Sequence, residues 1–344
     1  MPAGNISARR NLSPDTVFAF ASMKNLRLLI GVGVAAIALY FTFRDIDFSK
    51  FGEALRTANW PWFLPAAAAL LGVLVLRTAR WAAIMGGTPF CVTFHALNIG
   101  YMMNMLLPGR VGEIGRAYVI GARTPVSMPR AISAVVVERL LDLSSVLLML
   151  AGVAPFLPLP EGLVRPAAIS GVLLVSLLFA IVLIIALADR VEILLRRLLA
   201  RIPSVDAEPW ILRFREICAG FRMLGSPTRT VIVLALTAGV WAGSLAVCWC
   251  VMNAFLPPSL QASTLVVIVA NLGGVVPTPG GLGPAQYFAR LALEPFGGDI
   301  TRGVAFVFVW WIAQMLMLIA LGFAGLLQLG LSFHQLSGSA RTRD

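Results

Sequence analysis

Long apolar segments separated by short polar ones run through the chain from residue 26 to residue 330. Six of them are of bilayer-spanning length, since a hydrocarbon core needs about 20 residues of α-helix. They are Leu26–Phe43, Trp60–Leu76, Ala131–Val153, Val164–Ala188, Arg229–Met252 and Arg302–Leu329. Several of the tryptophans near these segments suit an interfacial belt, namely Trp60, Trp62, Trp81, Trp310 and Trp311. The pattern predicts an all-α polytopic membrane protein with about six full spans.

Two further apolar segments are too short to cross. Phe94–Leu107 and Ala262–Val276 have 14 and 15 residues, roughly 21–23 Å of helix against a core of about 30 Å. Each ends in a Pro/Gly break and is followed by another short helical stretch. Broken backbone at membrane depth is tolerated where protein or water satisfies its polar groups. We therefore expect two re-entrant hairpins.

Composition agrees with a membrane protein. Apolar residues make up 59% of the chain and charged residues 12%, with a mean hydropathy of +0.87. Cytosolic enzymes, nucleic-acid-binding factors and disordered scaffolds are excluded as leading classes because their charged fraction is higher. The four cysteines are scattered without a CxxC pair. We expect no metal site, no cofactor and no nucleic-acid partner.

Basic residues set the expected topology. With the N-terminus inside, six spans and two hairpins put both termini in the cytoplasm and place twenty of the 27 lysines and arginines on that side. This satisfies the positive-inside rule. The net charge of +11 then points to cytoplasmic loops and anionic headgroups, and the expected location is the cytoplasmic (inner) membrane.

The two breaks share the pattern Pro-Gly-x-x-Gly, at 108–112 and 279–283, which lie 171 residues apart. Because one hairpin opens inward and the other outward, the halves are predicted to be inverted repeats, the arrangement of many transporters. The expected organisation is a tail (1–25), one transmembrane domain (26–330) with halves at about 60–153 and 229–329 joined by an amphipathic cytoplasmic connection (189–228), and a second tail (331–344). The basic stretch Arg190–Ile202 fits either a helix on anionic lipid or a solvated linker packed on the bundle.

The breaks supply most of the candidate substrate-binding residues. The half-helix that starts near Gly112 presents free N–H groups that attract an anion, and Gly281 and Gly283 would let backbone approach a headgroup closely. Arg110 and Arg116 flank the first start and suit a phosphate, or they are merely positive-inside residues. The candidates at the breaks are Asn104, Pro108, Gly109, Arg110, Gly112, Glu113 and Arg116, then Pro277, Pro279, Gly280, Gly281, Gly283 and Gln286.

Three charged residues lie within the third full span. Glu138 and Asp142 share a helix face, and Arg139 reaches Asp142 at a spacing of three. Charges at this depth must pair or line a polar cavity. They form either a structural ion cluster, with Arg77 and Arg80 in support, or part of a headgroup or proton pathway.

Four ordered motifs carry a family resemblance. They are Arg77-Thr-Ala-Arg80-Trp81, the break from Asn104 to Arg116, Glu138-Arg139-Leu-Leu-Asp142 and Pro277-x-Pro279-Gly280-Gly281-Leu-Gly283. Together they resemble the transmembrane domain of lysylphosphatidylglycerol synthase/flippase proteins and its stand-alone relatives, over about residues 26–330. The resemblance implies a flippase-like protein that moves or handles a polar lipid. Gln286 stands where the family usually has Glu, and Phe308-Val-Trp310-Trp311 lacks an arginine common in its last span.

The leading hypothesis is translocation of a polar or phosphate-bearing lipid at a midplane site between the two hairpins: an anionic or aminoacylated phospholipid, a hopanoid-type lipid or a polyprenyl-linked lipid. Arg110, Arg116 and Arg139 would bind its phosphate, while Glu113, Glu138 and Asp142 would balance charge or meet a cationic headgroup. Synthase activity is not expected because no soluble transferase domain is present. Two alternatives stay open. One is a non-transporting subunit that binds a lipid-synthesis enzyme or a second copy of the chain. The other is an integral-membrane lipid-modifying transferase with Glu138 and Asp142 as acid and base.

Overall fold

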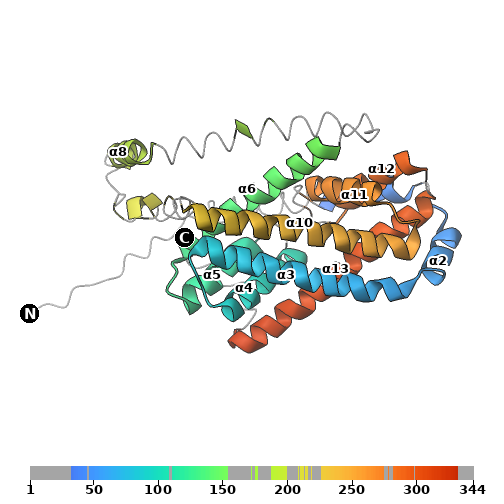
Figure 1. Ribbon diagram of the computed structural model, residues 1–344, viewed down its shortest axis with the longest axis horizontal. Helices are drawn as coiled ribbons and strands as arrows, with labels where there is room; N and C mark the ends of the chain where they lie inside the picture. The colour runs from blue at the N-terminus through green and yellow to red at the C-terminus, as the bar shows by residue number, and fades with distance from the viewer. Residues whose placement is uncertain are drawn as a thin grey trace, which may run out of the picture.

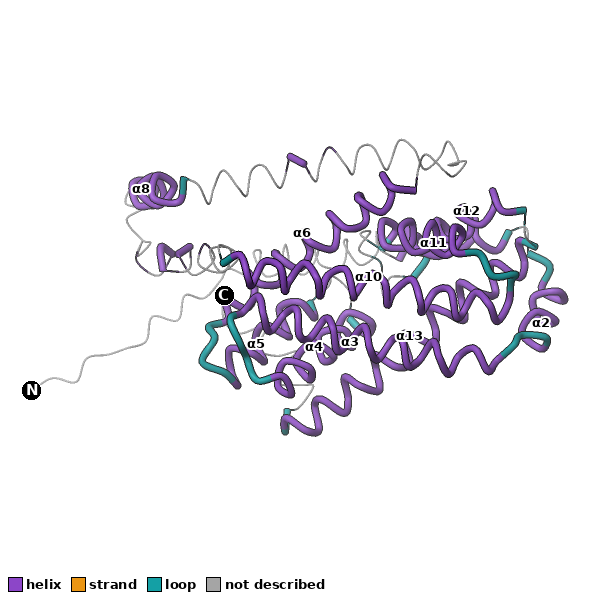
Figure 2. The backbone as a smooth tube through the Cα atoms, viewed as in Figure 1, coloured by secondary structure: helices purple, strands orange, loops and turns teal. Residues whose placement is uncertain are grey.

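Helices form all of the secondary structure in the described part of the chain, and no strand occurs there (Figures 1 and 2). The computed structural model describes residues 32–44, 46–107, 111–153, 187–199, 226–274, 282–297 and 299–331, together with 172, 175, 176, 208, 210–212, 214, 215, 218 and 278. The prediction of an all-α chain is confirmed for these residues.

The same order of four helices occurs in both predicted halves. The first half contains α3 (Phe63–Met85), α4 (Phe90–Leu106), α5 (Gly112–Arg123) and α6 (Met128–Val153). The second contains α10 (Pro227–Phe255), α11 (Leu260–Gly273), α12 (Pro284–Leu293) and α13 (Ile300–Leu329). Outside this pattern lie an apolar helix (Val32–Phe43), α2 (Phe48–Arg56), α8 (Ala188–Leu199) and two 3₁₀ turns, η1 (Trp60–Trp62) and η6 (Glu294–Phe296).

Local sequence sets the ends of the long helices. The Asp299 carboxylate accepts hydrogen bonds from the backbone N–H groups of Thr301 and Arg302, at 2.8 and 3.4 Å, and so caps the start of α13. Gly330 ends α13 at φ 59°, and Gly86 ends α3 at φ 93°. Glycine adopts this left-handed conformation without the steric cost that a Cβ adds.

Helices α3 and α10 form the most extensive helix pair among the described elements and run antiparallel. Val73 of α3 lies against Gly243 of α10, while the N–H of Asn59, before α3, donates to the Ala254 carbonyl near the end of α10 at 2.9 Å. A methyl group at Gly243 would come 2.7 Å from the Val73 side chain. Small residues thus let the two helices approach closely, as they do in membrane bundles.

Each break separates two helices that fold back on one another. Helix α5 returns along α4, and Gly100 of α4 meets Gly112 at the start of α5. Helix α12 returns along α11, where Gly273 lies against Pro284 and Phe288. Both segments are therefore helical hairpins, as predicted. Their re-entry into a membrane, and the side on which each opens, stay predictions.

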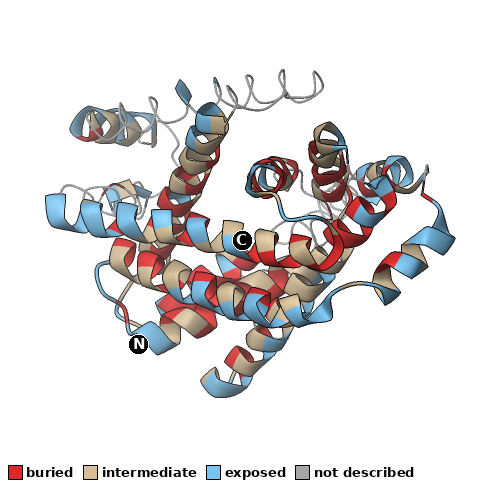
Figure 3. Ribbon diagram, turned by 45° about the vertical axis from the view of Figure 1, so that its right-hand side comes forward, coloured by how far each residue is buried: buried red, intermediate tan, exposed pale blue. Residues whose placement is uncertain are grey.

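Each half also packs against a helix of the other half. Helix α4 packs on α13, and α11 packs on α6. The first half's core accordingly includes Leu318 and Leu326 of α13, and the second half's core includes Val146 of α6. Buried residues follow the inner faces of the helices, while the outer faces are exposed (Figure 3). The equivalent helices α3 and α10 are antiparallel, and the inverted repeat of the halves stays a prediction.

Three described helices are long and apolar enough to span a membrane: Trp60–Met85, Pro227–Phe255 and Ile300–Leu329. They agree with three of the predicted spans. Large apolar side chains on their outer faces are exposed, among them Leu64 (79%) and Leu327 (83%), which suits contact with lipid. Helix α6 has 26 residues but carries the charged cluster. The predicted span Leu26–Phe43 is described from residue 32, and Val164–Ala188 falls largely outside the described residues.

The close contact between Gly100 and Gly112 predicts how a substitution there changes the stability of the protein. A methyl group at Gly112 would overlap the Gly100 carbonyl oxygen, whereas one at Gly72 of α3 would meet no atom within 4 Å. Gly112→Ala should therefore destabilise the protein by about 1–3 kcal/mol, the usual cost of overpacking. Gly72→Ala, the matched control, should be neutral or stabilising. Thermal unfolding in detergent compares the two, and equal transition temperatures would contradict this packing.

Candidate functional site

Seven charged side chains gather where α3, α5 and α6 meet, and we call this group the ion cluster. Its members are Arg77 and Arg80 of α3, Glu113 and Arg116 of α5, and Glu138, Arg139 and Asp142 of α6. Helical spacing presents them on the facing sides of the three helices. All seven were predicted from the sequence, with Arg77 and Arg80 in a supporting role.

Glu138 lies at the centre of the ion cluster and is fully buried. Its Oε1 is 3.1 Å from Nη2 of Arg80, and its Oε2 is 2.9 Å from Nη2 of Arg116. The Arg116 guanidinium also lies over the ring of Trp81, 4.7 Å from the ring centre. Cation–π contact of this kind adds to the ion pair in a desolvated site. Arg116 is thus buried between the Glu138 carboxylate and the Trp81 ring.

Asp142 extends the buried network, and Arg80 connects it to the second half. Nη1 of Arg80 donates to Asp142 Oδ1 at 2.7 Å, and Nη1 of Arg77 donates to Oδ2 at 3.4 Å. Arg80 is completely buried and also donates to the hydroxyl of Thr237 on α10 at 3.4 Å. Arg77 donates to the Tyr101 hydroxyl at 3.5 Å. These bonds connect α3 and α6 to α4 and α10.

Arg139 and Glu113 form the exposed edge of the ion cluster. The Arg139 side chain is 38% exposed and that of Glu113 is 27% exposed. Their contact is 3.3 Å long, between Nε and Oε1, and Arg139 lies 3.9 Å from Asp142 Oδ2. These contacts are longer than those of Arg80, so Arg139 is held more loosely. With four guanidinium groups and three carboxylates, the cluster has one excess positive charge.

The first break is closed by a side chain on its N-terminal side. Asn104, near the end of α4, accepts a hydrogen bond from the Gly112 N–H at 2.8 Å, which occupies one of the free donors at the start of α5. Glu113 lies in the first turn of α5, where the helix dipole favours a negative charge. Pro108, Gly109 and Arg110 lie outside the described residues.

The second break is covered by protein where the structure describes it. Gly283, at φ 104°, donates its N–H to Oε1 of Gln286 at 2.7 Å. A methyl group there would meet Ala35, because the Val32–Phe43 helix crosses this point. Gln286 is therefore a buried capping residue. Pro277, Pro279, Gly280 and Gly281 fall outside the described residues.

Arg290 of α12 fastens the Val32–Phe43 helix in that position. Its buried guanidinium donates to the carbonyl oxygens of Phe41 and Thr42, at 2.6 and 2.9 Å. A cation at the last carbonyls of a helix satisfies their free acceptors and opposes the helix dipole. Sequence reasoning missed this contact, because nothing near Arg290 in the sequence indicates a partner some 250 residues away.

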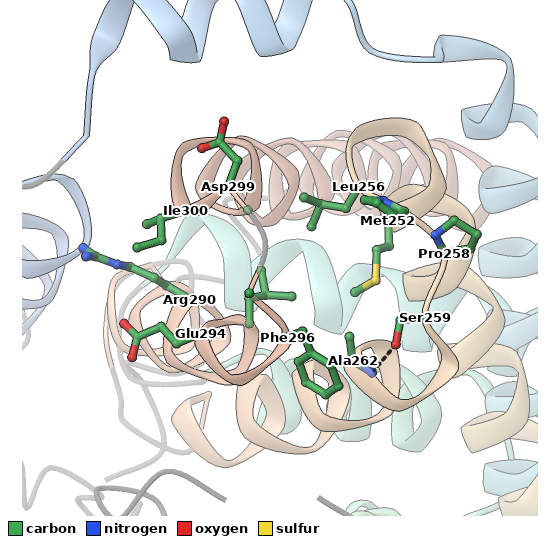
Figure 4. A pocket seen from close by; sticks show the side chains of 14 residues that line it. Met252, Leu256, Pro258, Ser259, Ala262, Arg290, Glu294, Phe296, Asp299 and Ile300 are labelled. Atoms are coloured by element: carbon green, nitrogen blue, oxygen red, sulfur yellow. Dashed lines mark hydrogen bonds between the residues drawn. The ribbon is translucent and has the colours of Figure 1, made fainter. Parts of the chain in front are cut away.

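A cavity of about 320 Å³ lies apart from the ion cluster, at one end of the second half (Figure 4). Its wall combines apolar side chains such as Met252, Phe296 and Ile300 with polar side chains that cap helix starts. Ser259 caps α11 and Asp299 caps α13. The Arg290 guanidinium extends away from the hollow (Figure 4). The cavity contains none of the predicted site residues, so the ion cluster remains the candidate site.

Sequence reasoning also missed three partners of the predicted residues. Trp81 is fully buried under Arg116 and so does not lie in an interfacial belt. Tyr101 and Thr237 accept hydrogen bonds from Arg77 and Arg80. The sequence signal for Trp81 was its place next to Arg80 in a motif. Among the described residues, no group of three His, Cys, Asp or Glu side chains is placed to hold a metal ion.

Comparison with known proteins shows the family of the chain. The family model described as the lysylphosphatidylglycerol synthase TM region matches residues 28–322. A "UPF0104 membrane protein" of Methanothermobacter thermautotrophicus is 24% identical over 329 residues, which cover 90% of this chain and 96% of that protein. No solved structure matches the chain. The chain therefore belongs to the lysylphosphatidylglycerol synthase transmembrane family and is a membrane protein.

The burial of Glu138 leads to a second prediction about stability. Glu138→Gln should destabilise the fold by about 3–5 kcal/mol, because it leaves Arg80 and Arg116 buried without their shared anion. Glu113→Gln is the same chemical change at the exposed edge and should cost about 1 kcal/mol or less. Adding Arg116→Met to Glu138→Gln should restore part of the loss.

Unfolding temperatures measured by size-exclusion chromatography of heated, detergent-solubilised protein would rank these variants. Equal losses for Glu138→Gln and Glu113→Gln would show that the cluster is uniformly hydrated and contradict its buried core.

Proposed function

We propose that this member of the lysylphosphatidylglycerol synthase transmembrane family translocates a polar, phosphate-bearing lipid across the cytoplasmic membrane. The observation that carries the proposal is the loose, exposed Arg139 on an ion cluster with one excess positive charge. A charged group within a membrane bundle is costly unless it is paired or faces a polar cavity. A lipid phosphodiester carries one negative charge and would complete the pairing.

The ion cluster separates into groups that hold the fold and groups that can exchange partners. Arg80 and Arg116 contact Glu138 and Asp142 at 2.7–3.1 Å in buried positions. Arg139 contacts Glu113 and Asp142 at 3.3 and 3.9 Å at the exposed edge. Phosphate oxygens, which bind guanidinium groups strongly and bidentately, can therefore replace the weaker carboxylate contacts of Arg139 while the buried pairs persist.

This assignment changes the roles of two predicted residues. Arg116 supports Glu138 instead of contacting the headgroup, since its guanidinium is already enclosed by Glu138 and Trp81. The described part of the second break is capped by Gln286 and covered by the Val32–Phe43 helix. In the proposal, the headgroup is therefore bound by the first half alone, beside Arg139.

Movement of the headgroup would depend on the contacts between the two halves. The α4–α5 hairpin is held by α13, and the α11–α12 hairpin contacts α6. A shift of one half against the other would change which side of the ion cluster is accessible, as in transporters built from inverted repeats. The acyl chains would remain in the lipid alongside the exposed helix faces.

The test is a headgroup-accessibility assay in proteoliposomes, with fluorescent phosphatidylglycerol, an aminoacylated derivative and a polyprenyl-linked lipid. The protein should accelerate movement of at least one of these lipids. Arg139→Gln should lower that rate at least about tenfold, the value of one lost charge-assisted contact. The control is Arg302→Gln, at an exposed arginine in the second half, which should leave transport unchanged.

Full transport by Arg139→Gln would overturn the role of the ion cluster. Absence of movement for every lipid, with folded protein, would instead favour a non-transporting subunit. Formation of a modified lipid would favour the transferase alternative.

A further inference from the structure

Helix α8 has an apolar face that no described helix covers. Ala188 is its only buried residue, and α8 makes no extensive contact with any other described element. It stands apart from the bundle (Figures 1 and 3). A solvated linker helix packed on the bundle, one of the two expectations for this stretch, would bury more of its surface.

The uncovered face is a continuous apolar row. Val191, Leu194, Leu195 and Leu198 follow the spacing i, i+3, i+4, i+7, which places them on one side of the helix. Leu194 and Leu198 are 55% and 48% exposed. A row of this kind left open to water on a stable helix needs a partner.

The opposite side of α8 is charged and has protein partners. Arg215 donates two hydrogen bonds to the Glu192 carboxylate, at 2.7 and 2.8 Å, and Arg196 donates to Glu208 at 2.9 Å. The hydrogen bond from Arg215 holds the pKa of Glu192 below its usual value. These bonds orient α8 through its polar side and neutralise Glu192. Arg190 and Arg197 flank the apolar row and are exposed.

We propose that α8 lies in the surface of an anionic lipid leaflet, with Val191, Leu194, Leu195 and Leu198 inserted among the acyl chains and Arg190 and Arg197 at the headgroups. The helix has 12 residues, about 18 Å, too short to cross a bilayer. It follows the predicted span Val164–Ala188, whose end would bring the start of α8 to a membrane surface. An apolar row flanked by arginines is the pattern of helices that bind anionic membrane surfaces.

Two positions of similar exposure on opposite sides of α8 test the proposal. Leu198 lies in the apolar row, whereas Ile193, 52% exposed, lies about 140° around the helix on the charged side. Each is replaced by cysteine for spin labelling, in a full-length chain whose exposed Cys91 is changed to serine. The label's accessibility to oxygen, which partitions into lipid, and to a water-soluble nickel chelate is then measured in vesicles.

In vesicles that contain phosphatidylglycerol, the oxygen-to-nickel accessibility ratio should be severalfold higher at Leu198→Cys than at Ile193→Cys. The contrast should shrink in purely zwitterionic vesicles. The double variant Arg190→Gln with Arg197→Gln should lower the equilibrium constant for binding of α8 to the anionic leaflet by roughly 30-fold, about fivefold for each charge.

Water accessibility at both positions in both kinds of vesicle would overturn the proposal and identify a solvated linker. Protection of the Leu198→Cys label from the nickel chelate that persists in detergent micelles and does not depend on lipid charge would also overturn it. That result would favour a protein partner or a second copy of the chain. The measurement does not depend on transport, so it can succeed or fail independently of the function proposed above.

Discussion

The burial of one carboxylate, Glu138, organises the first half of this protein. A carboxylate without contact to water needs cationic partners that are themselves desolvated, and two are supplied from different helices: Arg80 of α3 and Arg116 of α5. Arg80 then reaches Asp142 and Thr237, which brings α6 and α10 into the same network. The helices are thus placed by a requirement for charge compensation as well as by apolar packing.

The two halves use one architecture for different purposes. Both contain a helical hairpin whose glycines permit close contact, and each hairpin packs against the other half. Only the first half, among the described residues, places charges between its helices in this way. In the second half, Gln286 caps its own helix and Arg290 fastens the Val32–Phe43 helix. This difference supports a single headgroup site, at the exposed edge beside Arg139.

Much of this arrangement follows from local sequence signals. The apolar segments predict α3, α10 and α13, and the shared Pro-Gly-x-x-Gly pattern predicts both hairpins. The spacing of Glu138 and Asp142 predicts that they share a helix face. Arg80 was predicted in support of this cluster, but the pairing of Glu138 with Arg116 could not be predicted, because it depends on how three helices pack. The bond between Arg290 and Phe41 joins residues too distant in sequence for any periodic pattern to reveal. Trp81 resembled an interfacial residue, but cation–π contact with Arg116 holds it in the core.

In the proposed mechanism, a lipid phosphate binds Arg139 while Glu138 stays paired with Arg80 and Arg116. Solid-state NMR on protein with ¹⁵N-labelled arginine, in vesicles of the transported lipid, measures it directly through ³¹P–¹⁵N dipolar coupling. The account predicts one strongly coupled arginine, with phosphorus within about 4 Å of its nitrogens as hydrogen-bonded phosphate requires, and loss of that coupling in Arg139→Gln. Coupling that persists unchanged in Arg139→Gln would contradict it.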